Sequence, residues 1–502
     1  MIKKQFSLLN DPWIPVVDVG RVSLRQLFSE PAYRALGGNP VQKIALTKLL
    51  LAIAQAAYTP QDDDDWAALG AQGLAEKSLA YLEKWQDHFY LYGDQPFLQM
   101  PEITKAAEQS LGAVLPEIAT GNTTVVNAFQ LEKNLDDADK ALLILTLMGF
   151  ALAGKKTDNT VVLSETYTGK TKPNGKGMSG KAGTSIGFMG FLHNFLSGES
   201  ILQSLWFNLL SHEDIKTIGL YPQGLGAAPW EVMPQTEDCT TALQLQESVM
   251  GRLVPLSRFC LLTENGLHYS EGIAHPDYKS GVVDPSVAVN FKPKTPKIIW
   301  ADTERRPWRS LTALLSFMEA NGEFNCYTLQ MGLLRTRKQT AVENIGIWSG
   351  GLRVSSNAGE QYASGSDDFV ESSVFIPAEE LGENWYQQLK LEMKEIEKLA
   401  KTIYGASRQY FADLGIHDAK QAGFASNLFW QLCERQFQTL LYACEDSEQT
   451  KRLRKTFAAF ASKAYNDYCP KETARQLEAW AKNHPNLSKY MKDTAKPKEI
   501  QI

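Results

Sequence analysis

The C-terminal quarter of the chain carries the pattern that most restricts its fold. From Pro377 onward, apolar residues recur every three or four positions, the spacing that gathers them on one face of an α-helix. The four stripes are Trp385, Leu389, Met393, Ile396, Leu399 and Ile403, then Phe429, Cys433, Phe437 and Leu440, then Leu453, Phe457, Phe460 and Ala464, and a shorter one after Pro470 with Leu477 and Trp480. Short polar connections between stripes predict an antiparallel four-helix bundle over residues 377–502.

Residues 1–376 lack a single repeating pattern and predict a large, mixed, irregular α/β domain, so the fold class is α+β. Residues 5–28 are interpreted as an edge-type β opening that ends with a strand over Val22–Phe28. A core helix begins at Pro40, capped by Asn39. Residues 188–210 predict two helical segments broken at Ser197-Gly198, and residues 219–310 predict a small irregular β region.

Four consecutive aspartates, Asp62–Asp65, follow Pro60. Adjacent carboxylates cannot all point at one ion, so they are interpreted as the acidic start of a helix near Trp66. The six cysteines are scattered without a C-x-x-C pair, which argues against a structural zinc site or a disulfide framework. No metal and no cofactor is expected.

Charge and hydropathy restrict the partners. The net charge is −6 and the pI about 5.8, so contacts to nucleic acid must come from local basic patches. The N-terminal apolar stretch is interrupted by Asn10, Asp11 and Pro12, and no window approaches the roughly 18 apolar residues of a membrane span. A soluble cytoplasmic protein without a membrane partner is expected.

A run rich in glycine and lysine, Gly169–Gly190, stands out in the N-terminal region. Gly175–Lys181 fits G-x-x-x-x-G-K, but Ala182 stands where a P-loop needs Ser or Thr to hold Mg²⁺. Gly183–Gly187 fits G-x-S-x-G around Ser185, yet no apolar strand leads into the serine. A third interpretation is a loop against a nucleic-acid backbone, because glycines permit close approach and lysines neutralise phosphates. A surface loop without a partner remains the fourth.

Other segments add candidates of the same kind. Gly350–Ser372 predicts a hairpin with a polar tip between the β-prone flanks Leu352–Val354 and Phe369-Val370, and such a tip can present an amide to base pairs. Between Asn122–Asn134 and the helix over Ala141–Leu152, Phe129 is the large aromatic residue of a projecting loop. Leu333–Lys338 is interpreted as a basic turn. The third C-terminal helix is expected to present a basic outer face with Lys451, Arg452, Arg454, Lys455 and Lys463.

In order along the chain, several of these stretches resemble the CasA family, the large subunit of the type I-E CRISPR surveillance complex Cascade. The opening LLNDPWIPV and the later SLRQLF look like the N-terminal signature of the family, and DHFYLYGDQPFLQ is similar to its aromatic-proline-phenylalanine-glutamine stretch. The GGLRVSSNAGEQYASGSDDFVES hairpin and the C-terminal helices follow in the family's order. The resemblance covers nearly the whole chain and is weakest over residues 200–340.

The resemblance implies recognition without catalysis. The family's large domain contacts the PAM in double-stranded DNA, mainly from the minor groove, and wedges the duplex open for pairing with the CRISPR guide RNA. Its C-terminal bundle contacts other Cascade subunits and helps to recruit the helicase–nuclease.

Carried onto this sequence, the resemblance assigns residues to three loops. The glycine loop matches Gly177, Gly180 and Gly183, with Lys176 and Lys181 on phosphates, and the wedge matches Asn357, Ala358 and Gln361. The loop that meets the 5′ end of the guide RNA matches Asn127 and Phe129. The chain departs from the family in lacking the paired C-x-x-C motifs of some members. A minor-groove lysine finger also has no clear match in Thr263–Gly272.

Two other classes of function stay open at this point. One is an enzyme, either a nucleotide-dependent one that uses Lys181 or a serine hydrolase that uses Ser185. The other is a scaffold that binds partner proteins only.

Overall fold

A computed structural model of the chain describes residues 4–112, 114–115, 134–150, 161, 163–165, 190–339, 342–353 and 368–491. The chain divides into two compact units, Met1–Ser373 and Val374–Ile502, a division three residues before the sequence-based one at 376/377. The first unit mixes helices and strands and the second is helical, as the α+β prediction requires. None of the helices in the described ranges has both the length and the apolar character needed to cross a bilayer.

The N-terminal segment contains strands β1 (Gln5–Ser7), β2 (Ile14–Val16) and β3 (Gly20–Val22). β1 pairs with β4 (Tyr90–Tyr92), and β2 pairs with β3. The predicted strand over Val22–Phe28 is wrong, because these residues leave β3 and enter helix α1 (Leu24–Ser29). Ser23 and Gln26 cap α1 reciprocally, each side chain accepting from the other's backbone N–H.

Helix α2 (Pro40–Ala57) is buried on nearly all sides and forms the centre of the first unit. It begins as predicted, with Asn39 as its N-cap and Pro40 in its first turn. Asp62 caps α3 (Asp63–Lys84), so the aspartate run is the acidic start of a helix. Among the described residues, no group of His, Cys, Asp or Glu is arranged to hold a metal ion.

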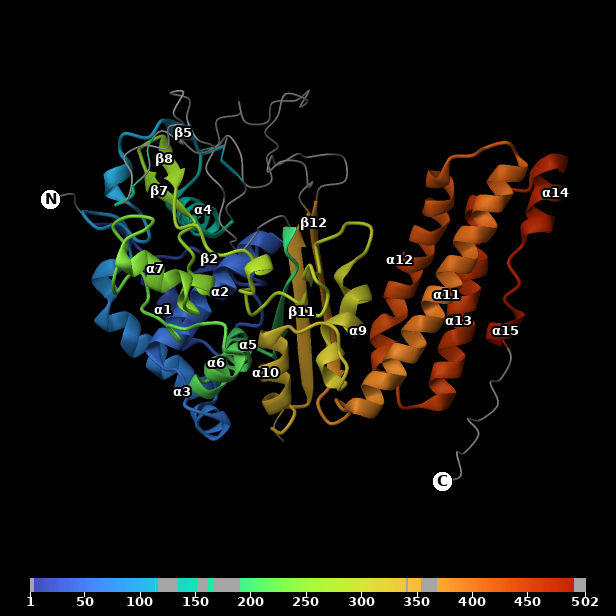
Figure 1. Cartoon of the computed structure of the whole chain (residues 1–502), viewed down its shortest axis with the longest axis horizontal. Helices are drawn as coiled ribbons and strands as arrows, with labels where there is room; N and C mark the ends of the chain where they lie inside the picture. Colours follow the sequence, from blue (N-terminus) through green and yellow to red (C-terminus); the bar gives the residue numbers. More distant parts are fainter. Residues whose placement is uncertain are drawn as a thin grey trace. The chain divides into compact units, whose positions relative to one another are not determined.

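A three-stranded sheet carries the segments of functional interest, with β11 (Asn344–Leu352) between β6 (His193–Ser197) and β12 (Phe369–Pro377) (Figure 1). β6 runs antiparallel to β11, with His193 opposite Gly350 and Ser197 opposite Gly346. The two helical segments predicted over residues 188–210 are therefore half wrong. The first part is strand β6, and only the second is a helix, α5 (Ile201–Asn208).

A second three-stranded sheet has the order β5-β8-β7, and a two-stranded hairpin joins β9 to β10. The irregular β region predicted for residues 219–310 contains β7, β8, β9 and β10 but also short helices, whereas β5 comes from an earlier part of the chain. The remaining elements of the first unit are η1 (Gln86–His88), η2 (Pro101–Ile103), β5 (Glu108–Ser110), α4 (Asp137–Gly149), α6 (His212–Ile218), α7 (Thr240–Gln246), α8 (Met250–Leu253), β7 (Arg258–Leu262), β8 (Gly266–Glu271), η5 (Tyr278–Ser280), β9 (Val289–Asn290), β10 (Lys297–Ile298), η6 (Pro307–Ser310), α9 (Leu311–Leu314), η7 (Ser316–Met318) and α10 (Tyr327–Thr336).

After the last residues of β12, the second unit contains the helices α11 (Glu383–Asp413), α12 (Ala419–Ala443), α13 (Ser447–Tyr468), α14 (Ala474–Asn483) and α15 (Ser488–Met491). The three long helices lie side by side and pack on one another, and α14 packs on α11 (Figure 1). The predicted apolar stripe of α11 is buried, from Trp385 to Ile403. The helical C-terminal unit is confirmed, and its arrangement as an antiparallel four-helix bundle stays a prediction.

Candidate nucleic-acid interface

The residues assigned to nucleic acid from the sequence all lie outside the described residues. They are Asn127, Phe129, Lys176, Gly177, Gly180, Lys181, Gly183, Asn357, Ala358 and Gln361, and Ser185 of the hydrolase alternative is outside as well. The structure does describe where the segments that contain them leave and rejoin the fold.

The segment matched to the wedge leaves from one strand and returns on its neighbour. β11 ends at Leu352 and β12 begins at Phe369, which agrees with the β-prone flanks predicted for a hairpin. The backbone N–H of Arg353 donates to the carbonyl of Asp368 at 3.0 Å. The Arg353 guanidinium also contacts the Asp302 carboxylate at 3.2 Å. This ion pair links the residue after β11 to the chain around Ala301.

The glycine-rich segment rejoins the fold beside the same strands. The backbone N–H of Ala301 donates to the carbonyl of Gly190 at 2.8 Å, and Phe191 forms a bridge with Trp300. β6 follows directly from His193. Gly190 has a φ of +80°, a conformation that glycine adopts without the steric cost of a side chain.

Leu163–Glu165, a few residues before the glycine-rich run, bond to the loop before α7. The backbone N–H of Glu237 donates to the carbonyl of Leu163 at 2.9 Å. Asp238 accepts from the backbone N–H of Glu165 at 2.7 Å and from the Ser164 hydroxyl at 2.5 Å. Leu163–Glu165, which precede the run, and Gly190, its last residue, thus both bond to other described parts of the first unit.

The attachment points of the two segments meet at Gly351. A Cβ at this position would lie 2.6 Å from the carbonyl oxygen of Phe191 and 3.1 Å from the Cβ of Ala301. Only a residue without a side chain lets β11 pass this close to the start of β6. The segments matched to the glycine loop and to the wedge are therefore rooted at the same end of one sheet.

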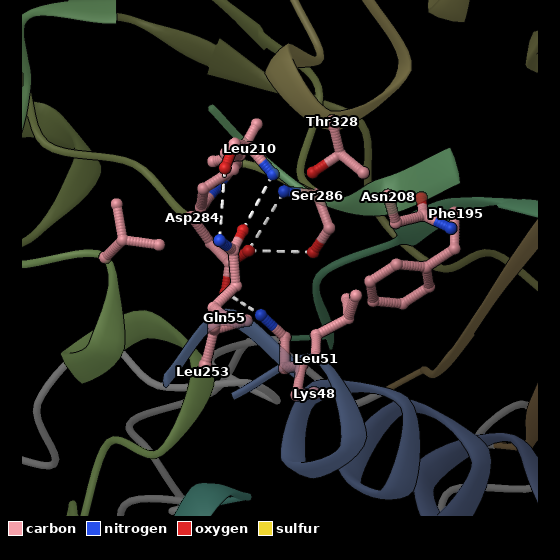
Figure 2. A pocket seen from close by; sticks show the side chains of 12 residues that line it. Lys48, Leu51, Gln55, Phe195, Asn208, Leu210, Leu253, Asp284, Ser286 and Thr328 are labelled. Atoms are coloured by element: carbon pink, nitrogen blue, oxygen red, sulfur yellow. Dashed lines mark hydrogen bonds and ion pairs between the residues drawn. The ribbon is translucent and has the colours of Figure 1, made fainter. Parts of the chain in front are cut away.

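A buried polar network supports this end of the sheet (Figure 2). The Lys48 ammonium on α2 contacts the Asp284 carboxylate at 2.5 Å, and Asp284 accepts from the Ser286 hydroxyl at 2.7 Å. Ser286 in turn lies 2.8 Å from Nδ1 of His193, the first residue of β6. Burial opposes ionisation of Asp284, but the charge of Lys48 lowers its pKa to about 2. The adjacent cavity, about 20 Å³, has room for about one water molecule, so this network is a structural support.

A basic hairpin missed in the sequence lies next to these roots. From the end of β9 to the first residue of β10 the chain reads FKPKTPK, which exposes Lys292, Lys294 and Lys297. The Lys292 ammonium donates to the carbonyl of Asn321 at 2.9 Å. Lys294 and Lys297 have no acidic partner within the described parts of the chain. Val289 and Ile298 of this hairpin pack with Phe191 in one buried cluster, which ties the lysines to the root of the glycine-rich segment.

The K-x-K-x-x-K spacing could have indicated this patch, because it places three cations on one short turn of an acidic protein. The glycine-rich run contains more lysines and gives the stronger compositional signal, so the phosphate contacts were predicted in that run.

The sheet β5-β8-β7 supports the third predicted segment. β5 ends at Ser110, before the segment with Asn127 and Phe129, and α4 begins after it with Asp136 as N-cap. The Arg21 guanidinium contacts Asp136 at 2.5 Å and fixes this return point. The β7–β8 turn exposes Glu264 and Asn265, so the described hairpin offers no lysine in the segment where a lysine finger was sought.

The predicted basic turn over Leu333–Lys338 is wrong for its first arginine. Arg335 lies at the end of α10 with a side chain only 2% exposed, and it contacts the Asp214 carboxylate at 2.8 Å. Its guanidinium also lies 5.0 Å from the centre of the Trp66 ring. The positive charge is therefore neutralised inside the first unit and does not reach a polyanion.

Comparison with known proteins identifies the family. The family model described as CRISPR-associated protein Cse1 matches residues 7–468. The chain belongs to this family. The resemblance to the CasA family seen in the sequence is thereby confirmed, since a curated relative from Thermus thermophilus carries both names, CasA/Cse1. That relative is 30% identical over 165 residues, which is 30% of this chain and 32% of the relative, so the aligned region spans about a third of its length.

Solved Cse1 structures share the fold of nearly the whole chain. CasA of Thermus thermophilus has a TM-score of 0.74 at 19% identity and covers 97% of this chain and 99% of its own. Cse1 of Thermobifida fusca has a TM-score of 0.77 at 20% identity, with 97% and 98% covered. A chain of a structure described as a CRISPR RNA-guided surveillance complex has a TM-score of 0.71 at 16% identity, with 98% and 100% covered.

Proposed function

We propose that this Cse1-family chain is a non-catalytic subunit of a CRISPR RNA-guided surveillance complex in the cytoplasm. In this role it recognises the PAM of double-stranded DNA through the minor groove and wedges the duplex open so that the guide RNA can pair. Its C-terminal helices, arranged as a four-helix bundle, contact other Cascade subunits and help to recruit the helicase–nuclease. Family membership and the shared fold with a chain of a CRISPR RNA-guided surveillance complex support the general role.

The finer proposal rests on one observation: the glycine-rich segment and the segment matched to the wedge attach at the same end of one sheet. Gly190 and Arg353 are the described residues next to these two segments. Both lie at the end of the sheet where Gly351 passes the Phe191 backbone. A glycine-rich segment that enters a groove and a hairpin that parts the base pairs must act on the same few base pairs, so they need adjacent attachment points. Opening a base step costs a few kcal/mol, whereas guide pairing roughly balances the DNA duplex that it replaces. The subunit therefore needs to start opening only beside the PAM.

The basic β9–β10 hairpin supports a phosphate contact next to these roots. Lys294 and Lys297 extend from a hairpin whose core side chains pack on Phe191. Lysine ammonium groups at such a place neutralise backbone phosphates without reading sequence. They would hold the duplex while the two segments act on it.

The test uses the complex reconstituted with wild-type chain or with either of two variants, Asn357→Ala/Gln361→Ala and Gly180→Asp/Gly183→Asp. Binding of a duplex with the PAM, a duplex without it and a pre-opened target is measured at one salt concentration, because phosphate contacts depend on salt. A Gln72→Ala variant, on the exposed side of α3, serves as the matched control.

We expect both variants to lose binding to the PAM duplex while the pre-opened target binds as it does to wild type. If both variants bind every target like wild type, the groove-and-wedge proposal fails and a scaffold is favoured. If the purified chain hydrolyses a nucleotide or an ester, and Lys181→Ala or Ser185→Ala abolishes this activity, the enzyme alternative is favoured.

A further inference from the structure

Trp300 is the most exposed of the eleven tryptophans, at 38%. Seven of the others donate their indole N–H within the protein: Trp13, Trp66, Trp206, Trp230, Trp348, Trp385 and Trp480. The indole N–H of Trp300 has no hydrogen-bond partner among the described residues. Part of the ring and its N–H are therefore open to a ligand, although exposure of a single apolar residue is by itself ordinary.

The ring of Trp300 is held in a fixed orientation. It stacks on Phe191 with ring centres 5.5 Å apart and an interplanar angle of 28°. Tyr278 meets it edge to face at 6.1 Å. Phe191 and Tyr278 both belong to a buried cluster, so the exposed part of the indole is presented from a rigid support.

The charges around Trp300 favour a polyanion. The Lys279 ammonium lies 5.8 Å from the centre of the Tyr278 ring, and Lys297 is exposed three positions before Trp300. Within the described residues, only one of the two neighbouring aspartates is paired with a cation. Asp277 accepts the backbone N–H of Lys279, and Asp302 contacts Arg353. Lys279 thus follows a residue that touches the Trp300 ring, and Lys297 lies on the strand that leads to Trp300. Proteins bind single-stranded nucleic acid with aromatic faces and cations in the same region of the surface.

Trp300 also lies at the common root of the two predicted DNA segments, since it bridges to Phe191 and precedes Ala301, which holds Gly190. A duplex opened there yields two strands, and the target strand pairs with the guide RNA. Only the displaced strand keeps unpaired bases next to the opening.

We propose that Trp300 is a stacking platform for a base of the displaced DNA strand beside the PAM, with Lys279 and Lys297 on the adjoining phosphates. The proposal rests on the proposed function and adds to it a contact that traps the opened state. Stacking on an aromatic face tolerates any base, so this contact would stabilise opening without adding sequence preference.

The experiment measures target binding by the reconstituted complex with Trp300→Leu, which keeps an apolar side chain but removes the aromatic face, and with Trp300→Phe, which keeps a ring. Phe424→Leu, a half-exposed aromatic residue of the second unit, is the matched control. Each complex is tested on a PAM duplex and on a pre-opened target. In both targets a single abasic site is moved through the displaced strand next to the PAM.

We expect Trp300→Leu to weaken binding of both targets about tenfold, and Trp300→Phe and Phe424→Leu to stay within about twofold of wild type. The difference between Trp300→Leu and wild type should disappear when the abasic site occupies one particular position. On that target wild type also has no base to stack on Trp300. Wild type itself should lose about tenfold at that position. This last measurement needs no variant and therefore does not depend on how the variants fold.

Different results separate this proposal from the proposed function. Loss of pre-opened target binding is specific to the platform, because the glycine-rich and wedge variants should spare that target. A loss with Trp300→Leu that is equal at every abasic position overturns the platform. So does reduced incorporation of Trp300→Leu into the complex with normal DNA binding per complex, which would assign the ring to a protein contact.

Discussion

Arg335 illustrates how a charge is stabilised inside this protein. Its guanidinium is buried against Asp214 and Trp66, and burial lowers its pKa while Asp214 opposes that shift. Asp214→Asn keeps the shape of the side chain but removes the buried counter-charge of the arginine, so that, among the described residues, only the half-exposed Asp63 carboxylate at 3.8 Å remains. We expect a loss of about 3 kcal/mol in the free energy of unfolding, measured by urea denaturation.

Asp63→Asn is the control, because the Asp63 carboxylate is half exposed and 3.8 Å from Arg335; its cost should stay below about 1 kcal/mol. The double variant Arg335→Met/Asp214→Asn should lose less than the sum of its single changes, since no unpaired charge remains. Equal effects of Asp63→Asn and Asp214→Asn would contradict the assignment.

Glu237 predicts a pH dependence of stability. Burial, together with the charges of Glu271 and Asp238, raises its pKa to about 7 from an ordinary value of 4.5. Between these two values the folded chain retains a proton that the unfolded chain has lost, so stability falls as pH rises from 4.5 to 7 and the loss is complete above 7.

Glu237→Gln removes that penalty while the backbone bond to Leu163 remains. The variant should match wild type near pH 4.5 and exceed it at about pH 8 by at most about 3 kcal/mol in urea unfolding. A variant that is less stable than wild type at the higher pH would show that the carboxylate is a net stabilising partner there.

At the scale of elements, one ion pair joins two helices of the second unit. Arg454 on α13 donates through Nε to Glu392 on α11 at 2.8 Å and through Nη2 at 2.5 Å, and Glu392 is only 3% exposed. The basic outer face predicted for α13 is therefore wrong for Arg454. We expect Glu392→Gln to cost about 2 kcal/mol in the free energy of unfolding.

The cost should appear as faster hydrogen exchange in peptides from α11 and α13, measured by mass spectrometry. Glu448→Gln, which removes an exposed pair with Lys451 on one helix, should change the free energy of exchange by less than about 0.5 kcal/mol. Similar exchange in both variants would mean that the buried bidentate pair adds nothing beyond a surface pair.

Sequence patterns predicted the elements whose signals are local. Asn39 and Pro40 indicate α2, and the spacing from Trp385 to Ile403 indicates α11, because capping and periodicity depend on residues close together in the chain. The strand predicted over Val22–Phe28 is wrong even though Ser23 and Gln26 form a recognisable capping box. β6 was missed because its five residues, HNFLS, are too few to show a strand period and bury His193 and Asn194 as well as apolar side chains.

The features of the candidate site also divide into those with a local sequence signal and those that depend on distant parts of the chain. Residues 350–372 were correctly interpreted as β-flanked, because strands β11 and β12 have β-prone sequences. The meeting of Phe191 with Gly351 could not be predicted, since it joins residues far apart in the chain. The burial of Arg335 likewise depends on other segments, which bring Trp66, Leu209 and Asp214 to it.

For the whole molecule, a net charge of −6 requires that attraction to DNA come from local cations. Lys294 and Lys297 are candidates, and Lys294→Gln/Lys297→Gln removes two positive charges next to the proposed site. If each contacts one phosphate, the slope of log K against log salt for duplex binding should become shallower by about 2. Lys216→Gln, at the exposed end of α6, should leave the slope unchanged, and a slope unchanged in both variants would remove the hairpin from the interface.

The close approach at Gly351 also governs how this surface can diverge over evolutionary time. Any side chain there would push β11 away from the Phe191 carbonyl and so separate the two attachment points. Insertions and deletions between Arg353 and Asp368, or before Gly190, leave that contact intact. We therefore expect lineages that face new invader sequences to vary the lengths and tips of these segments freely while this one position stays fixed, so that target preference evolves without a new scaffold.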